Sequence, residues 1–122
     1  MDIKRGWIYL ADLSPRRGTE PGKTRPVLVL QTDLLNKVGH PSSIVIPLTT
    51  NVVNDAEPLR VRIKADHAGF SKESDLMMDQ IRAIDNRRLF KQGTNVPIKR
   101  IAVLEKELLQ RVETCLRQIL EL

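Results

Sequence analysis

The chain is divided into short runs of aliphatic residues, and turn-forming residues separate each run from the next. Val, Ile and Leu dominate these runs, as they do in β-strands. Their lengths and the turn signals between them favour a β-rich fold over a helical bundle. The runs that predict strands are residues 5–13, 26–31, 42–50, 59–65 and 75–84.

One of these runs, residues 59–65, alternates strictly between apolar and basic side chains. Successive side chains of a strand point to opposite faces, so this alternation predicts one apolar face and one cationic face. The apolar face consists of Leu59, Val61, Ile63 and Ala65. The cationic face consists of Arg60, Arg62 and Lys64.

The period changes in residues 104–122, where apolar residues recur at helical spacing. This pattern predicts an amphipathic helix with a wide apolar face. Two shorter helical turns are expected at residues 32–39 and 85–90. The first of these has Thr32 or Asp33 as its cap and Gly39 as its end. The apolar positions of the long helix are Leu104, Leu108, Val112, Cys115, Ile119 and Leu122.

Short strands followed by one helix predict a mainly β, β-rich α+β architecture. The expected form is a small antiparallel barrel or strongly bent antiparallel sheet, closed by the C-terminal α-helix. A chain of 122 residues supplies one core, so a single domain over residues 1–122 is expected. The apolar helical face either packs on this sheet or completes a dimer.

The composition, 41% hydrophobic and 29% charged residues, is that of a chain that folds in water. No apolar run approaches the roughly 20 residues of a membrane span. The N-terminal residues lack the pattern of a secretion signal, so a cytoplasmic location is expected. The single cysteine, Cys115, has no internal disulfide partner and is expected to be a small buried apolar residue.

Positive charge is concentrated in the body of the chain. Residues 1–100 hold 17 Lys and Arg against 11 Asp and Glu, whereas residues 101–122 hold 3 against 4. A basic body suits a polyanionic partner such as a nucleic acid. A basic surface that only aids solubility accounts for the composition equally well.

The residue types that usually bind metals and cofactors are scarce. The histidines, His40 and His67, lie in expected loops, and one cysteine cannot complete a zinc site with them. No phosphate-binding glycine loop or nucleophile elbow is present, so neither a metal nor a cofactor is expected. An enzyme with this sequence would use Arg, Thr, Glu and Asp. Such a set suits RNA cleavage by the substrate's own 2′-hydroxyl, which requires proton transfer and support for a charged phosphorane.

Three segments in order, followed by the predicted C-terminal helix, closely resemble the MazF/PemK family of toxin endoribonucleases. The segments are RGWIYLADLSPRRGTEPGKTRPVLVLQTD, IVIPLTTN and LMMDQIRAID, and the resemblance runs from Arg5 to about Ile119. It implies an SH3-like (PemK/CcdB-like) barrel with a C-terminal helix, acting as a homodimer. It also implies the toxin of a type II toxin–antitoxin system, an mRNA interferase that cleaves single-stranded RNA sequence-selectively without metal. The products would be 2′,3′-cyclic phosphate and 5′-hydroxyl ends, and a cognate antitoxin with an acidic disordered tail would neutralise the enzyme.

The resemblance places the family's catalytic arginine at Arg25 and its catalytic threonine at Thr49, with Thr50 as the alternative in the next register. A guanidinium held at a strand start can bind two phosphate oxygens, and a threonine hydroxyl can donate to a third. Glu20 is the candidate assisting base.

Three further residues are expected to contact RNA. Thr19 shares with Glu20 the loop over the substrate groove in such toxins, and Gln80 and Arg82 line the same groove. Only four aromatic residues are present in the chain, so base recognition is expected to rely on Arg planes and amides.

Two other functions fit parts of the sequence. One is a barrel that poisons a protein target, as CcdB-type toxins do, and the other is a non-catalytic nucleic-acid-binding barrel. The joint presence of Arg25 and Thr49 argues against the protein-targeting toxin, whereas the positive charge also permits the non-catalytic barrel, which does not require these two residues.

Overall fold

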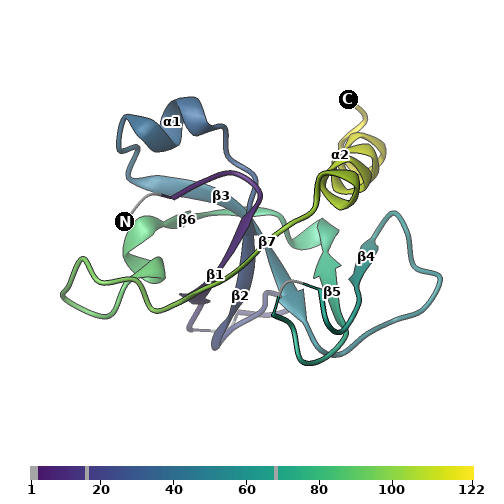
Figure 1. Cartoon of the computed structure of the whole chain (residues 1–122), viewed down its shortest axis with the longest axis horizontal. Coiled ribbons are helices and arrows are strands. Elements are labelled where there is room, and N and C mark those ends of the chain that lie inside the picture. The colour runs from purple at the N-terminus through teal and green to yellow at the C-terminus, as the bar shows by residue number, and fades with distance from the viewer. Residues whose placement is uncertain (1–2, 16, 68) are drawn as a thin grey trace.

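The computed structural model describes residues 3–15, 17–67 and 69–122. Within these residues, seven strands form one curled antiparallel sheet (Figure 1). The elements are β1 (Trp7–Asp12), β2 (Thr24–Val29), α1 (Asp33–Lys37), β3 (Ser42–Thr49), β4 (Arg60–Ile63), β5 (Ser74–Met77), the 3-10 helix η1 (Met78–Gln80), β6 (Arg82–Asp85), the 3-10 helix η2 (Asn86–Leu89), β7 (Arg100–Val103) and α2 (Lys106–Leu120).

The strand order is β4-β5-β3-β2-β1-β7, and β6 pairs with β3 beside β5. Strand β3 is therefore central, with β2 along one edge and both β5 and β6 along the other. This arrangement confirms the predicted fold class, a mainly β chain with a strongly curled antiparallel sheet and a C-terminal helix.

Each face of the sheet has its own core. One cluster lies between the sheet and α2, where Val112 and Cys115 are buried, as expected for Cys115. The other lies on the opposite face, where Leu13 and Leu89 pack against strand residues such as Val27. Residues that alternate along β2 and β3 thus serve different clusters, which explains why these strands read as continuous apolar runs.

The prediction of one strand at residues 75–84 was wrong, because η1 interrupts it. Strand β3 pairs Leu48 with Leu76 of β5 and Val45 with Arg82 of β6. Three residues along β3 therefore face six residues along the partner segment. The excess of three is taken up by the three-residue turn of η1, whose Met78 is buried against the α2 side.

Two other strands differ from expectation. Strand β7 was not predicted, and it pairs with β1 across a register shift between Ile8 and Tyr9. Strand β4 is shorter than the alternating run, so Val61 and Ile63 are buried whereas Leu59 lies outside the strand and is exposed. Four residues of the alternating run are therefore paired as a strand, rather than seven.

Both predicted helical segments in the first and last thirds of the chain are present. Thr32 caps α1 by accepting from the Leu34 amide at 3.2 Å, and Gly39 follows its end with a left-handed φ of 73°. Helix α2 is amphipathic and ends with Glu121 in the left-handed region. In Figure 1, α1 and α2 lie at opposite ends of the curled sheet.

Candidate active site

Arg25 lies at the start of β2, where the chain leaves the 18–24 loop. Pro26 follows it with a fixed φ and no N–H, which suits the first residues of a strand. Strand β2 pairs Arg25 with Ala11 of β1, which holds its backbone in the sheet. The guanidinium is half-buried and donates from Nε to the Gly22 carbonyl (2.9 Å) and from Nη1 to the Leu48 carbonyl (3.3 Å). It is therefore anchored beside the end of β3.

Thr49, the last residue of β3, lies near Arg25. The β2–β3 ladder pairs Val29 with Val45 and Val27 with Pro47. Arg25 is two residues from Val27 and Thr49 is two residues from Pro47, so alternation along the two strands places both on the same sheet face. Arg25 Nη1 donates to the carbonyl of Leu48, the residue before Thr49. The structure thus brings the two predicted catalytic residues together on one face.

The hydroxyl of Thr49 is suited to donate a hydrogen bond. Its Oγ1 accepts from the Asn51 amide at 3.1 Å, so the hydroxyl hydrogen points elsewhere and can serve a ligand. Thr50 follows the end of the strand, where it is exposed in a bend.

A buried acid lies opposite Thr49. Asp75 of β5 pairs with Thr49 and also with Arg62 of β4, so three adjacent strands place Thr49, Asp75 and Arg62 in one row across the sheet. The Asp75 side chain is fully buried and accepts from Arg62 Nε at 2.6 Å and from Arg60 Nη1 at 3.3 Å. The hydrogen bond from Arg62 to Asp75 raises the pKa of the Arg62 guanidinium.

Asp75 also fixes the loop that leaves Thr49. Its Oδ2 accepts from the Val53 amide at 2.8 Å, and Arg60 donates to the Asn51 carbonyl at 3.2 Å. The expected row of cations on β4 is therefore largely an ion-pair network. Sequence reasoning missed Asp75, although two arginines on the same face of a strand require an acidic partner when they are partly buried.

Thr19 and Glu20 are exposed on the 18–24 loop. The Glu20 amide donates to the Arg17 carbonyl at 2.9 Å, which forms a turn at the loop tip. Pro21 and Gly22 are buried at the loop base, and Gly22 carries the carbonyl that Arg25 binds. The hydrogen bond from Arg25 to Gly22 thus ties the base of the loop that carries Glu20 to Arg25.

Gln80 and Arg82 lie on the other side of β3 from Arg25. Both are half-buried, Gln80 in η1 and Arg82 opposite Val45 at the start of β6. Val45 is four residues from Thr49, which is about 13 Å along a strand. Arg82 is therefore too far from Thr49 to share one phosphate with it, but it shares the same sheet face.

Among the residues that the structure describes, no group of three or more His, Cys, Asp or Glu is placed to hold a metal ion. Over the same residues, no helix is both long and apolar enough to cross a membrane.

Comparison with known proteins identifies the family. Residues 4–120 match the model of the PemK-like, MazF-like toxins of type II toxin–antitoxin systems. The chain belongs to this family. It is 38% identical over 117 residues to endoribonuclease EndoA of Bacillus subtilis (strain 168), covering 96% of this chain and 93% of that protein. It is 40% identical over 87 residues to endoribonuclease MazF of Staphylococcus epidermidis, covering 71% and 72% of the two chains.

Solved structures share the fold. MazF of Deinococcus radiodurans superposes with a TM-score of 0.77 at 24% identity, covering 100% of this chain and 99% of that one. A MazE–MazF complex from the same organism superposes with a TM-score of 0.73 at 23% identity, covering 100% and 98% of the two chains. The match to the family model and the two sequence relatives confirm the predicted family and establish the chain as an endoribonuclease toxin of the MazF/PemK type.

Proposed function

We propose that the chain cleaves single-stranded RNA sequence-selectively and without a metal ion, leaving 2′,3′-cyclic phosphate and 5′-hydroxyl ends. The observation that supports this proposal is the hydrogen bond from Arg25 to the carbonyl of Leu48, which holds the guanidinium beside Thr49 on one sheet face. A cationic fork and a hydroxyl donor at that spacing can bind the non-bridging oxygens of one phosphate.

In the proposed reaction the 2′-oxygen attacks the adjacent phosphorus, and the 5′-oxygen leaves as it takes up a proton. Arg25 stabilises the negative charge of the phosphorane, and Thr49 donates to one of its oxygens. Glu20 is the candidate base that accepts the 2′-hydroxyl proton. The exposed position of Glu20 on the loop requires the loop to cover the substrate for this transfer.

Incubation of purified protein with a long single-stranded RNA and excess EDTA tests the proposal. We expect discrete cuts at a recurring short sequence, with cyclic phosphate and 5′-hydroxyl ends identified by end-labelling and mass spectrometry. Cleavage that EDTA abolishes, or products with 5′-phosphates, would contradict it. Binding of RNA with no cuts would support a non-catalytic barrel.

Replacement of Thr49 by valine tests the hydroxyl donor. Valine is nearly isosteric, so the sheet should persist while cleavage slows by about 10-fold or more. The measurement is kcat/KM on a defined RNA. Thr50→Val is the matched control, and a larger loss from that variant would place the donor one residue further along.

RNA contacts beyond the scissile phosphate are proposed for Thr19, Gln80 and Arg82. Their support is positional, because Thr19 lies on the loop that leads to Arg25, Arg82 lies opposite Val45 on the sheet face of Thr49, and Gln80 lies in η1 just before β6. Together they would extend the site along a flexible, anionic chain.

We also propose that the toxin is a homodimer. Helix α2 buries Val112 and Cys115 in its own core, but Leu120 and Leu122 at its end are exposed. The neighbouring 51–59 segment, which Glu57 ties to Arg111 of α2, exposes further apolar residues. An apolar surface of this kind suits a second copy of the chain. The exposed apolar residues of the 51–59 segment are Val52, Val53 and Leu59.

A cognate antitoxin with an acidic disordered tail is proposed as the inhibitor. The basic body of the chain attracts such a tail, and an extended peptide can follow the groove that RNA would occupy. We expect a saturating antitoxin peptide to prevent RNA binding in a fluorescence competition assay. RNA and peptide bound together with cleavage unaffected would contradict this proposal.

A further inference from the structure

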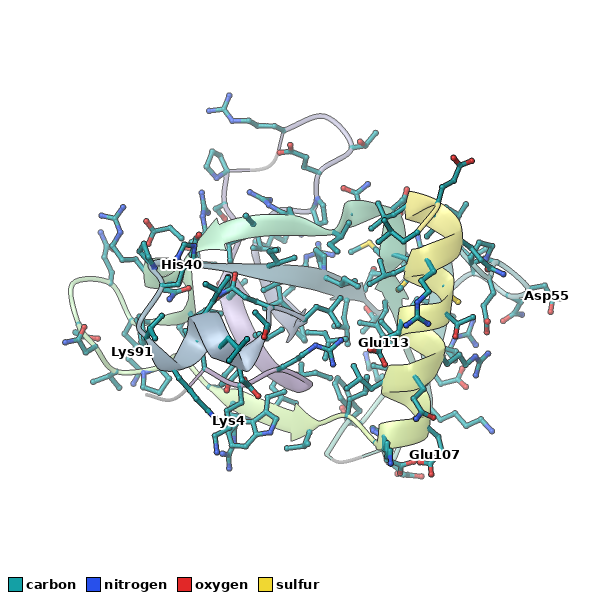
Figure 2. All side chains as sticks on the ribbon, turned by 90° about the horizontal axis from the view of Figure 1, so that it is seen from above. Lys4, His40, Asp55, Lys91, Glu107 and Glu113 are labelled. Carbon is teal, nitrogen blue, oxygen red and sulfur yellow. The ribbon has the colours of Figure 1, made fainter. Side chains whose placement is uncertain are left out.

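A second polar pocket opens at the end of the β1–β2 pair. Its volume is about 790 Å³. One wall is formed by Asp12 and Thr24, which oppose each other in the β1–β2 ladder. The other is formed by η2 and the hairpin of residues 90–97 that follows it. Figure 2 shows Lys91 of this hairpin projecting at the end of the molecule opposite α2. Thr24 directly precedes Arg25, so the pocket begins next to the candidate active site.

The lining combines the groups that single-stranded RNA requires. Lys91 and Arg88 supply positive charge, the half-buried Phe90 supplies a ring, and Gln92 and Asn95 supply amides. Cations bind phosphates, aromatic rings stack with bases, and amides bind base edges. Among the described residues, Phe90 is the one aromatic residue of the pocket lining, and the chain has few aromatic side chains.

The acidic residues of the lining do not cancel its charge. Asp85 is bound by Arg87 through two hydrogen bonds of 3.0 Å, and the hydrogen bond from this side chain lowers the pKa of Asp85. The carboxylate of Asp12 can accept from the amino group of a base. An acidic peptide would bring further carboxylates close to Asp12 and Asp85, and this like-charge repulsion favours a nucleotide with a donating base over an antitoxin tail.

Arg88 connects the pocket to the active-site loop. Its Nη1 donates to the carbonyls of Asp12 (3.0 Å) and Ser14 (2.7 Å), which lie where β1 ends and the loop towards Thr19 and Glu20 begins. A guanidinium has five N–H donors, so three remain for a ligand beyond these two bonds. A phosphate bound at Arg88 would therefore lie against the start of the loop that carries Thr19 and Glu20.

The hairpin wall is ordered by its own hydrogen bonds. The Lys91 amide donates to the Val96 carbonyl at 2.8 Å, and Thr94 Oγ1 donates to the Lys91 carbonyl at 2.8 Å and accepts from the Val96 amide at 3.1 Å. Phe90 forms a β-bridge with Pro97. Hydrogen bonds within the hairpin thus hold its backbone in a turn, and this turn carries the side chains of Gln92 and Asn95.

We propose that this pocket binds one nucleotide of the RNA substrate that flanks the cleavage site, with its base on Phe90 and its phosphate at Arg88 and Lys91. The inference rests on the proposed function, because it assigns part of the same substrate to a second site. An RNA long enough to reach this pocket should therefore bind more tightly than a shorter RNA that covers only the cleavage site.

The test compares RNAs of different length that carry a 2′-deoxy nucleotide at a mapped cleavage position, so that they bind without being cut. A short RNA is compared with two longer ones, extended by several nucleotides at the 5′ or the 3′ end, by fluorescence anisotropy. For the wild type, one extension should tighten binding by about 10-fold, the effect of one stacked base with its phosphate. Phe90→Leu and Lys91→Gln should each reduce this gain to about 2-fold or less.

For each protein, the affinity for the longer RNA is divided by the affinity for the short RNA. This ratio cancels any general loss of affinity or of folded protein. Lys72→Gln removes an exposed cation outside the pocket and should keep the full gain. The proposal is overturned if neither extension tightens binding, or if both pocket variants keep the gain. It is also overturned if those variants weaken only inhibition by an antitoxin peptide, which would make the pocket a peptide site. Absence of cleavage by the wild type would defeat the proposed function instead, and binding of oligonucleotides of increasing length would still test the pocket.

Discussion

Replacement of Arg25 by alanine should lower kcat/KM for RNA cleavage by at least about 100-fold, the effect of removing a principal donor to a developing oxyanion. The guanidinium is held by the carbonyls of Gly22 and Leu48, so its position beside Thr49 is fixed before substrate arrives. Preorganised charge of this kind acts on the transition state more than on binding, and kcat should carry most of the loss. Initial rates on a defined RNA, with circular dichroism to follow folding, provide the measurement.

Two control variants separate this role from net charge. Arg25→Lys keeps the charge but loses the fork, so it should recover little of the activity. Arg17→Ala removes the same charge from an exposed position in the neighbouring loop and should change the rate by less than about 3-fold, a surface-charge effect. Equal losses from Arg17→Ala and Arg25→Ala, or a folded Arg25→Ala variant with normal kcat, would remove Arg25 from the site.

Local patterns were sufficient to predict the elements that carry the two central residues. The predicted strand at residues 26–31 overlaps β2, which begins two residues earlier, the predicted strand at residues 42–50 contains β3, and the helical period of the C-terminus is α2. These predictions succeeded because burial on both sheet faces or on one helix face leaves a strong periodic signal. The resemblance to a family then assigned roles to Arg25 and Thr49, and the hydrogen bond from Arg25 to the Leu48 carbonyl brings the two residues together.

Features that depend on pairing between distant segments could not be predicted in the same way. Residues 75–84 look like one strand, but β3 pairs with its two halves in registers that differ by three residues, which η1 absorbs. Strand β7 is short and half exposed, so its sequence carries little periodicity. Asp75 looks like a polar residue at the edge of an apolar run until β4 brings two arginines to it.

Replacement of Asp75 by alanine should have the largest effect on stability. It strips the partner from the Val53 amide and leaves Arg60 and Arg62, both about three-quarters buried, without their shared carboxylate. The loss of a buried acceptor from such a network costs roughly 3 kcal/mol of unfolding free energy. Urea unfolding followed by circular dichroism measures this change. Glu73→Ala is the matched control, because Glu73 pairs with the same Arg62 at 3.5 Å from an exposed position and should cost less than about 1 kcal/mol.

The same network predicts an effect on catalysis through Thr49. Asp75 opposes Thr49 in the sheet and, with Arg60, holds the backbone of Asn51 and Val53, so it positions the end of β3 without reaching the substrate. Asp75→Asn retains the shape but places an amide donor among arginines, and we expect kcat to fall by about 10-fold with KM nearly unchanged. In the Thr49→Val background the same change should cost little, because the group that it positions is already absent. Equal losses in both backgrounds would mean that Asp75 supports the fold alone, since a general loss of stability does not depend on whether residue 49 has a hydroxyl.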